Sequence, residues 1–175
     1  MRDHAPVPPT PRLRLATSAD VDIVGDLTVD AYITGGHLSA GSTYESTLRD
    51  VGSRLDHTIV ATDDDQVIGA VTITPPGHPL TSFAQDDEWE IRFLAVRSGL
   101  WGHGAGRALM AAAHQRAAEH RATAIVLRVV ETNERGRGLY TQLGYQPIAD
   151  RDWAPPSTPP ILLMAYRRLL DTMDS

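Results

Sequence analysis

Residues 99 to 110 read GLWGHGAGRALM, in which glycines at positions 99, 102, 104 and 106 lead directly into a run of alanine, leucine and methionine. The preceding EWEIRFLAV predicts a strand over residues 88–96. Because glycine lacks a Cβ atom, the backbone of such a loop can approach a ligand closely, and a helix that begins behind it supplies unpaired N–H groups. A strand, this loop and a helix from about residue 106 to residue 120 together predict an anion-binding turn.

Two well-known phosphate-binding motifs do not fit this loop. A P-loop requires Gly-x-x-x-x-Gly-Lys-Ser/Thr, but Arg107 and Ala108 follow Gly106 and the sequence contains no lysine. The dinucleotide fingerprint Gly-x-Gly-x-x-Gly also fails, because the glycines at 102, 104 and 106 are spaced Gly-x-Gly-x-Gly. The sequence therefore predicts an anion-binding loop of another type.

Composition narrows the class of protein. A chain of 175 residues suits one domain, and we expect it over residues 12–170, between a flexible Pro-rich N-terminus (1–11) and a short tail (171–175). The net charge of −6 argues against a general nucleic-acid binder, which needs a basic face. Cysteine is absent, which excludes thiol nucleophiles, thiolate metal sites and disulfides.

Other classes of site lack their sequence signals. The seven histidines are scattered, so no metal site is expected. The stretch GHLSAG is one residue too long for the Gly-x-Ser-x-Gly turn of serine hydrolases. ILLMAY, among the longest apolar stretches, is far shorter than the roughly 20 residues of a membrane span. The start MRDHAPVPPTPR has prolines where a signal peptide would be apolar, so we expect a cytoplasmic protein without a membrane partner.

The rest of the chain predicts strands and helices. RLRLAT alternates with period two, and apolar residues recur at helical spacing from Val21 to Ala31 after the helix-start signal TSAD. A weaker helical pattern runs through Leu48, Val51 and Leu55. Then follow a hairpin (57–62 and 66–74), an exposed loop (74–87), strands at 88–96 and 124–130, a short helix (134–144) and two strands (145–148 and 161–169) around the Pro-rich loop 150–160. Hairpins followed by alternating strands and helices predict a mixed sheet in an α/β domain.

Two segments resemble the GNAT superfamily of acyl-CoA-dependent N-acetyltransferases. LAVRSGLWGHGAGRALM is similar to the family's motif A, Gln/Arg-x-x-Gly-x-Gly/Ala after a strand, with Gly104 and Gly106 on the two small positions and Trp101 in place of Gln or Arg. NERGRGLYTQLGY is similar to the family's Asn-x-x-Ala-x-x-Leu-Tyr…Leu-Gly-Phe segment. The resemblance spans residues 12 to 169, and similar AYITGGHL and DRDW segments occur in actinobacterial members of undefined substrate.

This resemblance implies a GNAT fold, a mixed and mostly antiparallel sheet of about seven strands flanked by about four helices, with two splayed central parallel strands. It also implies acetyl-CoA as acyl donor, held mainly by backbone groups of the 88–96 strand and the glycine loop. The Leu94 amide is expected to polarise the acetyl carbonyl, and Arg107, Arg135 and Arg137 are available to the phosphates. The expected cofactor-binding residues are Leu94, Ala95, Val96, Trp101, Gly102, His103, Gly104, Ala105, Gly106, Arg107, Asn133 and Gly136.

In family members the acceptor amine attacks the thioester directly in a ternary complex, so the resemblance implies that no nucleophile of the enzyme is required. The acceptor amine must lose a proton, which costs about 4 kcal/mol at neutral pH for a pKa near 10. Glu90 aligns with a strand glutamate that serves as general base in some members, often through water, and His37 is the alternative base. Tyr140 aligns with the residue that protonates the departing thiolate.

The acceptor site is expected from the AYITGGHLSAGSTYE and DRDWAPPSTPP segments. Tyr32, His37, Tyr44 and Trp153 form an aromatic pocket for an amine or are core anchors. Three functions stay open: acetylation of a small primary amine, acetylation of a protein lysine or N-terminus, and acyl-CoA sensing without catalysis. The negative charge favours cationic acceptors through steering, and the sequence is compatible with a homodimer.

Overall fold

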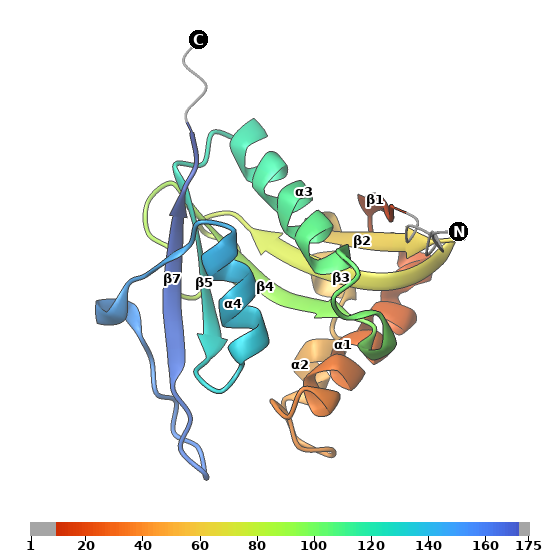
Figure 1. Cartoon of the computed structure of the whole chain (residues 1–175), viewed down its shortest axis with the longest axis horizontal. Helices are drawn as coiled ribbons and strands as arrows, with labels where there is room; N and C mark the ends of the chain where they lie inside the picture. The colour runs from red at the N-terminus through yellow and green to blue at the C-terminus, as the bar shows by residue number, and fades with distance from the viewer. Residues whose placement is uncertain (1–9, 172–175) are drawn as a thin grey trace, which may run out of the picture.

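A computed structural model of the chain, which describes residues 10–171, shows one seven-stranded sheet with helices on both faces (Figure 1). The strand order is β1-β2-β3-β4-β5-β7-β6, and β4 and β5 are parallel whereas the other neighbours are antiparallel. The strands are β1 (Arg12–Leu15), β2 (Thr58–Asp63), β3 (Gln66–Thr74), β4 (Glu88–Val96), β5 (Ala124–Val130), β6 (Gln146–Pro147) and β7 (Leu163–Leu169). The predicted mixed, mostly antiparallel sheet is confirmed.

Within residues 10–171, four α-helices accompany the sheet: α1 (Val21–Thr34), α2 (Glu45–Arg49), α3 (Ala105–Glu119) and α4 (Glu134–Gln142). Leu109, Met110 and Ala113 of α3 lie in one core cluster with the β4 and β5 side chains Ile91 and Leu127. A second cluster joins α1 to the sheet, through Val24, Leu27 and Ala31 against Val60, Val67, Ala70 and Ala95. Residues 1–9 and 172–175, which contain most of the two predicted terminal segments, lie outside the described part of the chain.

The TSAD start signal is confirmed in the short 3-10 helix η1 (Ser18–Asp20) that precedes α1. Asp20 accepts a hydrogen bond from the backbone N–H of Thr17 at 2.7 Å and forms an ion pair with Arg14 of β1 at 2.7 Å. The Arg14 guanidinium lowers the pKa of Asp20 to about 2, although burial opposes the shift. This carboxylate therefore ties the first strand to the entrance of the first helix.

The weak helical pattern through Leu48, Val51 and Leu55 does not form a single helix. The α2 helix ends at Arg49, and a separate 3-10 segment, η2 (Gly52–His57), follows with a non-helical Arg54 inside it. The Arg54 guanidinium turns inward and donates to the backbone carbonyls of Thr47, Leu48 and Asp50 at 2.7 to 3.0 Å. Because these carbonyls at the end of α2 are satisfied by a side chain, the helix has no need to continue.

No helix within residues 10–171 is both long enough and apolar enough to span a membrane.

Candidate active site between the central strands

The central parallel strands β4 and β5 pair over only part of their length. Their register runs from Glu88 opposite Ala124 to Ile91 opposite Leu127 and then stops, while β4 continues to Val96. Beyond this point β5 stays paired with β7 on its other side. The backbone of β4 after Ile91 is therefore left unpaired on the side that faces β5, and this is the opening that the resemblance predicted.

A β-bulge changes the direction of β4 within this opening. Ala95 pairs with Ala70 and Arg92 with Thr72, so Phe93 and Leu94 together oppose one residue of β3, and Phe93 has a φ of +55°. Such a bulge redirects the backbone groups that follow it. The bulge thus lies at Leu94, whose amide is the predicted oxyanion donor.

The glycine loop begins where β4 ends. Gly102 and Gly104 have φ values of +81° and +90°, a conformation that favours glycine, and a Cβ atom at either position would meet open space. Gly104 is the N-cap of α3. Within residues 10–171, the backbone amides of Gly102 and of residues 104–107 donate no hydrogen bond to any protein group. Open space with unpaired N–H groups at a helix start fits the diphosphate of coenzyme A.

Trp101 fills the position where related sequences carry Gln or Arg. Its indole Nε1 donates to the carbonyl oxygen of Val96 at 2.7 Å, and the Arg135 guanidinium lies over its ring at 4.7 Å from the ring centre. The Arg97 N–H donates to β3, so the polar groups of Val96 point away from β3. Trp101 therefore fastens the glycine loop to the end of β4 through the Val96 carbonyl, which leaves the Val96 N–H for a ligand.

The three arginines assigned to the phosphates have different surroundings. Arg107 donates to the Gln142 side chain at 2.6 Å. Arg137 donates to the Tyr166 hydroxyl at 3.2 Å and to the Glu131 carbonyl at 2.9 Å, so both already have protein partners. Arg135, stacked on Trp101, donates no hydrogen bond to a described residue, and it carries positive charge next to the loop.

Asn133 and Gly136 belong to the start of α4. The Asn133 side-chain oxygen accepts the Gly136 N–H at 2.9 Å, so Asn133 is the N-cap of the helix. A Cβ atom at position 136 would lie 2.8 Å from Asn133 Nδ2, so the Asn133 side chain packs closely on this glycine. The capping interpretation of Asn133 is confirmed, and its contact with a cofactor stays a prediction.

Tyr140 of α4 is 8% exposed and packs edge-on against Tyr145, with the ring centres 5.8 Å apart. Its hydroxyl makes no hydrogen bond to any described residue. Burial raises the pKa of Tyr140 to about 12, so the hydroxyl is protonated throughout the neutral range. A departing thiolate accepts a proton or a hydrogen bond, and it needs a donor that is protonated and has no other partner. The Tyr140 hydroxyl meets both conditions.

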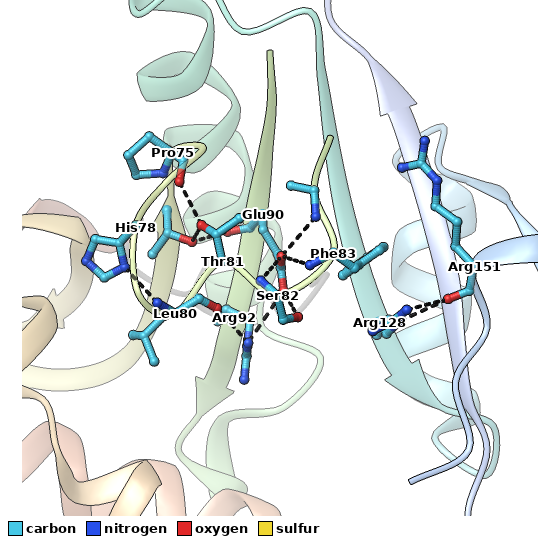
Figure 2. A network of polar contacts seen from close by, with 12 residues as sticks. Pro75, His78, Leu80, Thr81, Ser82, Phe83, Glu90, Arg92, Arg128 and Arg151 are labelled. Atoms are coloured by element: carbon cyan, nitrogen blue, oxygen red, sulfur yellow. Dashed lines mark hydrogen bonds and ion pairs between the residues drawn. The ribbon is translucent and has the colours of Figure 1, made fainter. Parts of the chain in front are cut away.

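Glu90 is 1% exposed and lies under the β3–β4 loop, residues 75–87 (Figure 2). Its Oε2 accepts the backbone N–H groups of Ser82, Phe83 and Ala84 at 2.8, 3.0 and 3.3 Å. Its Oε1 accepts the Ser82 hydroxyl at 2.8 Å and lies 3.5 Å from Arg92. Ser82, which donates to both oxygens of the buried carboxylate, is itself an exposed residue.

Glu88 lies on the same side of β4 but serves a different purpose. Its oxygens accept Arg151 Nη1 and Arg167 Nε, each at 2.7 Å, and the Gln85 N–H at 3.0 Å. Burial would raise the pKa of Glu88, but the hydrogen bonds from Arg151, Gln85 and Arg167 outweigh it and lower the pKa. This carboxylate is a structural anchor between β4, β7 and the 3-10 turn η4 (Ala149–Arg151).

The structure brings together only some of the predicted acceptor residues. Burial raises the pKa of Tyr32, and the charges that Tyr44 and Tyr140 carry when ionised add to the shift. Trp153, 49% exposed, bridges to Leu163 of β7 and lies beside Arg128. The His37 ring folds back toward Gly35, and its buried Nδ1 has no hydrogen-bond partner among the described residues. Burial lowers the pKa of His37, so it is neutral at pH 7.

Sequence reasoning missed Ser82, Arg92 and Arg128. Ser82 lies in a loop that reads as exposed and polar, and only the folded loop places it over Glu90. Arg92 and Arg128 carried one usable signal: each is a charged residue inside an otherwise apolar strand, in RFLAV and LRVV.

The chain is similar to known acetyltransferases in sequence and in fold. The sequence matches the Acetyltransferase (GNAT) family over residues 27–145. No curated protein matches the chain. Similar solved structures include the ribosomal-protein-S18-alanine N-acetyltransferase of Escherichia coli, with 14% identity and a TM-score of 0.70 over 95% of this chain and 97% of that one.

Two further structures share the fold. One is yncA of Salmonella typhimurium, solved with its cofactor acetyl-CoA, with 17% identity and a TM-score of 0.71 over 95% and 98% of the two chains. The other is a GCN5-related N-acetyltransferase from Kribbella flavida, with 22% identity and a TM-score of 0.70 over 91% and 98%. Since the family match covers more than half of the sequence, the chain belongs to the GNAT family of acetyltransferases.

Proposed function

We propose that the protein transfers the acetyl group of acetyl-CoA to a primary amine, by direct attack of the amine in a ternary complex. The observation that carries this proposal is the end of β4–β5 pairing at Ile91 and Leu127, next to a glycine loop with unpaired amides. An unpaired strand edge can hold an extended amide-containing chain such as pantetheine, and the loop can hold the diphosphate.

In this proposal, backbone groups make most of the contacts with acetyl-CoA. The unpaired amides of Gly102 and of residues 104–107 bind the diphosphate, and the Ala95 and Val96 segment runs along the pantetheine. The Leu94 amide, in the bulge, donates to the acetyl oxygen as negative charge develops on it. Arg135, held over Trp101, adds positive charge for the phosphates.

Glu90 receives the proton of the acceptor ammonium through Ser82. The ammonium transfers a proton to Ser82 Oγ while the Ser82 hydroxyl proton moves to Glu90 Oε1, so the relay ends with a neutral amine and a neutral carboxyl group. The distance from Ser82 Oγ to Oε1 is 2.8 Å, within the range for proton transfer, and Glu90 itself is too buried to touch the acceptor. His37, neutral and with an unpartnered ring nitrogen, is the alternative base.

Tyr140 stabilises the departing sulfur. A thiol of ordinary pKa, about 8.5, is a stronger acid than a tyrosine of pKa about 12. The hydroxyl therefore acts chiefly as a hydrogen-bond donor to the thiolate as the bond to carbon breaks, and full proton transfer follows from the tetrahedral intermediate or from solvent.

Two measurements test this function. Isothermal titration calorimetry with acetyl-CoA tests donor binding, and thiol release from acetyl-CoA with a panel of primary amines tests turnover. The chain contains no cysteine, so a thiol reagent reports only released coenzyme A. Amine-dependent thiol release supports the transferase. Binding without release by any amine, protein amines included, would support the acyl-CoA sensor instead, and no binding would contradict both.

A further inference from the structure

Arg92 and Arg128 occupy equivalent places on the two sides of the opening. Each follows the last residue of its strand that takes part in the β4–β5 pairing, Ile91 in β4 and Leu127 in β5. Figure 2 shows the two side chains on either side of the gap between these strands, with Ser82 of the loop between them. Ile91 and Leu127 point into the α3 core, so the arginines, one residue later in each strand, lie on the opposite face of the sheet, with Glu90.

Each guanidinium group is held in place by a backbone carbonyl and an aromatic ring. Arg92 Nη1 donates to the Leu80 carbonyl at 2.7 Å, and the guanidinium lies 4.9 Å from the centre of the Phe93 ring. Arg128 Nε and Nη2 donate to the Arg151 carbonyl at 3.0 and 2.7 Å, and the guanidinium lies 4.0 Å from the centre of the Phe83 ring. Both groups are therefore oriented before any ligand arrives.

Both guanidinium groups have N–H donors that no described protein atom accepts. Within residues 10–171, Nε and Nη2 of Arg92 and Nη1 of Arg128 donate to no protein atom. Arg92 is 23% exposed and Arg128 is half-buried, so water reaches these groups only in part. Partly desolvated N–H donors of a cation are costly unless a ligand pairs with them.

The charge of these groups is also incompletely balanced. No carboxylate of the described residues lies within 4 Å of Arg128, although Glu90 and Asp152 are near enough to influence its charge. Arg92 is 3.5 Å from Glu90, whose two oxygens already accept four hydrogen bonds from Ser82, Phe83 and Ala84. A third cation, Arg54, is 2% exposed, donates only to neutral carbonyls and lies 4.5 Å from the centre of the Phe93 ring.

We propose that the acceptor is a small amine that also carries a carboxylate, as an amino acid does, and that Arg92 and Arg128 bind this carboxylate at the mouth of the opening. The inference rests on the proposed function and names its substrate class. Guanidinium groups match the planar geometry of a carboxylate and form strong charge-assisted hydrogen bonds with it. The local charge thus selects an acidic acceptor although the whole chain carries a charge of −6.

The test compares amines that differ only in the carboxylate. Each of a panel of L-amino acids is assayed beside its carboxamide and its decarboxylated amine, with thiol release from acetyl-CoA as the readout. We expect kcat/KM for the best amino acid to exceed that for its amide by ten- to a hundredfold, which corresponds to about 1.4 to 2.8 kcal/mol and is typical of a charge-assisted hydrogen bond.

Arg92→Gln and Arg128→Gln are expected to remove this preference, by raising KM for the amino acid at least tenfold more than KM for the amide. Arg12→Gln, in β1 and far from the opening, is the matched control for loss of one positive charge. Arg128→Lys keeps the charge but not the planar fork, and it should restore only part of the preference.

The outcomes separate the two proposals. Turnover with amides equal to amino acids, or an equal loss with both substrates in the arginine variants, would overturn this inference and leave the acetyltransferase proposal standing. Turnover confined to peptide or protein amines would also overturn it. An absence of thiol release with every amine would contradict the proposed function and, with it, the inference.

Discussion

At the scale of single residues, the buried carboxylate of Glu90 has two roles that an ordinary substitution cannot separate. It holds the β3–β4 loop by accepting three backbone N–H groups, and it is the proposed base. In Glu90→Gln the new NH2 group competes with those N–H donors, so a loss of activity would report loop displacement as much as base removal.

Ser82→Ala is the cleaner change. The Ser82 amide still donates to Glu90, whereas the hydroxyl that links the carboxylate to the acceptor is lost. We expect kcat to fall about tenfold or more, because a positioned proton carrier contributes this much or more. Ser82→Thr keeps the hydroxyl and should retain most of kcat. Steady-state thiol release with both variants is the measurement, and equal rates in the wild type and Ser82→Ala would exclude the relay.

Tyr140→Phe tests the other end of the reaction. Since the hydroxyl has no hydrogen-bond partner in the described structure, its removal should leave the unfolding temperature unchanged, while the ring still packs on Tyr145. We expect kcat to fall ten- to a hundredfold with unchanged affinity for acetyl-CoA in calorimetry. A large loss of affinity, or an unaltered kcat, would contradict the assignment.

At the scale of elements, the start of α3 is expected to depend on backbone conformation rather than on side chains. Gly104→Ala places a Cβ atom at a residue with φ of +90°, at a cost of about 1 to 2 kcal/mol, and in the space assigned to the diphosphate. We expect the acetyl-CoA Kd to rise at least tenfold. Gly99→Ala, also in open space but without a positive φ, is the matched control and should bind normally. Equal affinity of the two variants in calorimetry would contradict the anion cradle.

The elements differ in how far the sequence predicts them. The strand, glycine loop and helix of residues 88 to 120 carry strong local signals, and both the elements and the glycine conformations follow the sequence. The α2 region does not, because Arg54 reaches back to carbonyls of Thr47, Leu48 and Asp50, a contact that no periodicity encodes. Ser82, Arg92 and Arg128 were missed for the same reason, because their partners are set by tertiary packing of the loop at 75–87 and, for Arg128, of the turn at Arg151.

At the scale of the whole molecule, stability should depend on the protonation of His114. This residue of α3 shares a hydrogen bond of 2.8 Å with the Tyr145 hydroxyl and contacts Arg168 of β7. Burial, with the charge of Arg168, lowers the pKa of His114 to about 4 from an ordinary 6.5. The folded state therefore holds the neutral ring, and its stability is complete above pH 6.5 and declines as the pH falls toward 4.

Between pH 7.5 and 5.0 this decline amounts to about 2 kcal/mol, since only the unfolded chain takes up the proton. Urea unfolding at the two pH values measures it. His114→Gln cannot titrate and should lose about 2 kcal/mol less than the wild type over this interval, which lies above the range in which Asp20 and Glu88 are protonated. The same pH dependence in both proteins would contradict the assignment.

The short β4–β5 pairing affects how strongly the two halves of the sheet are held together. Within residues 10–171, backbone pairing between the four-stranded half of the sheet and the three-stranded half is confined to the register from Glu88 to Ile91 (Figure 1). A molecule bound in the opening contacts both halves of the sheet and links them. Binding of acetyl-CoA should therefore raise the unfolding temperature. In the free protein, amides along this seam should exchange with deuterium earlier than those in the middle of either half.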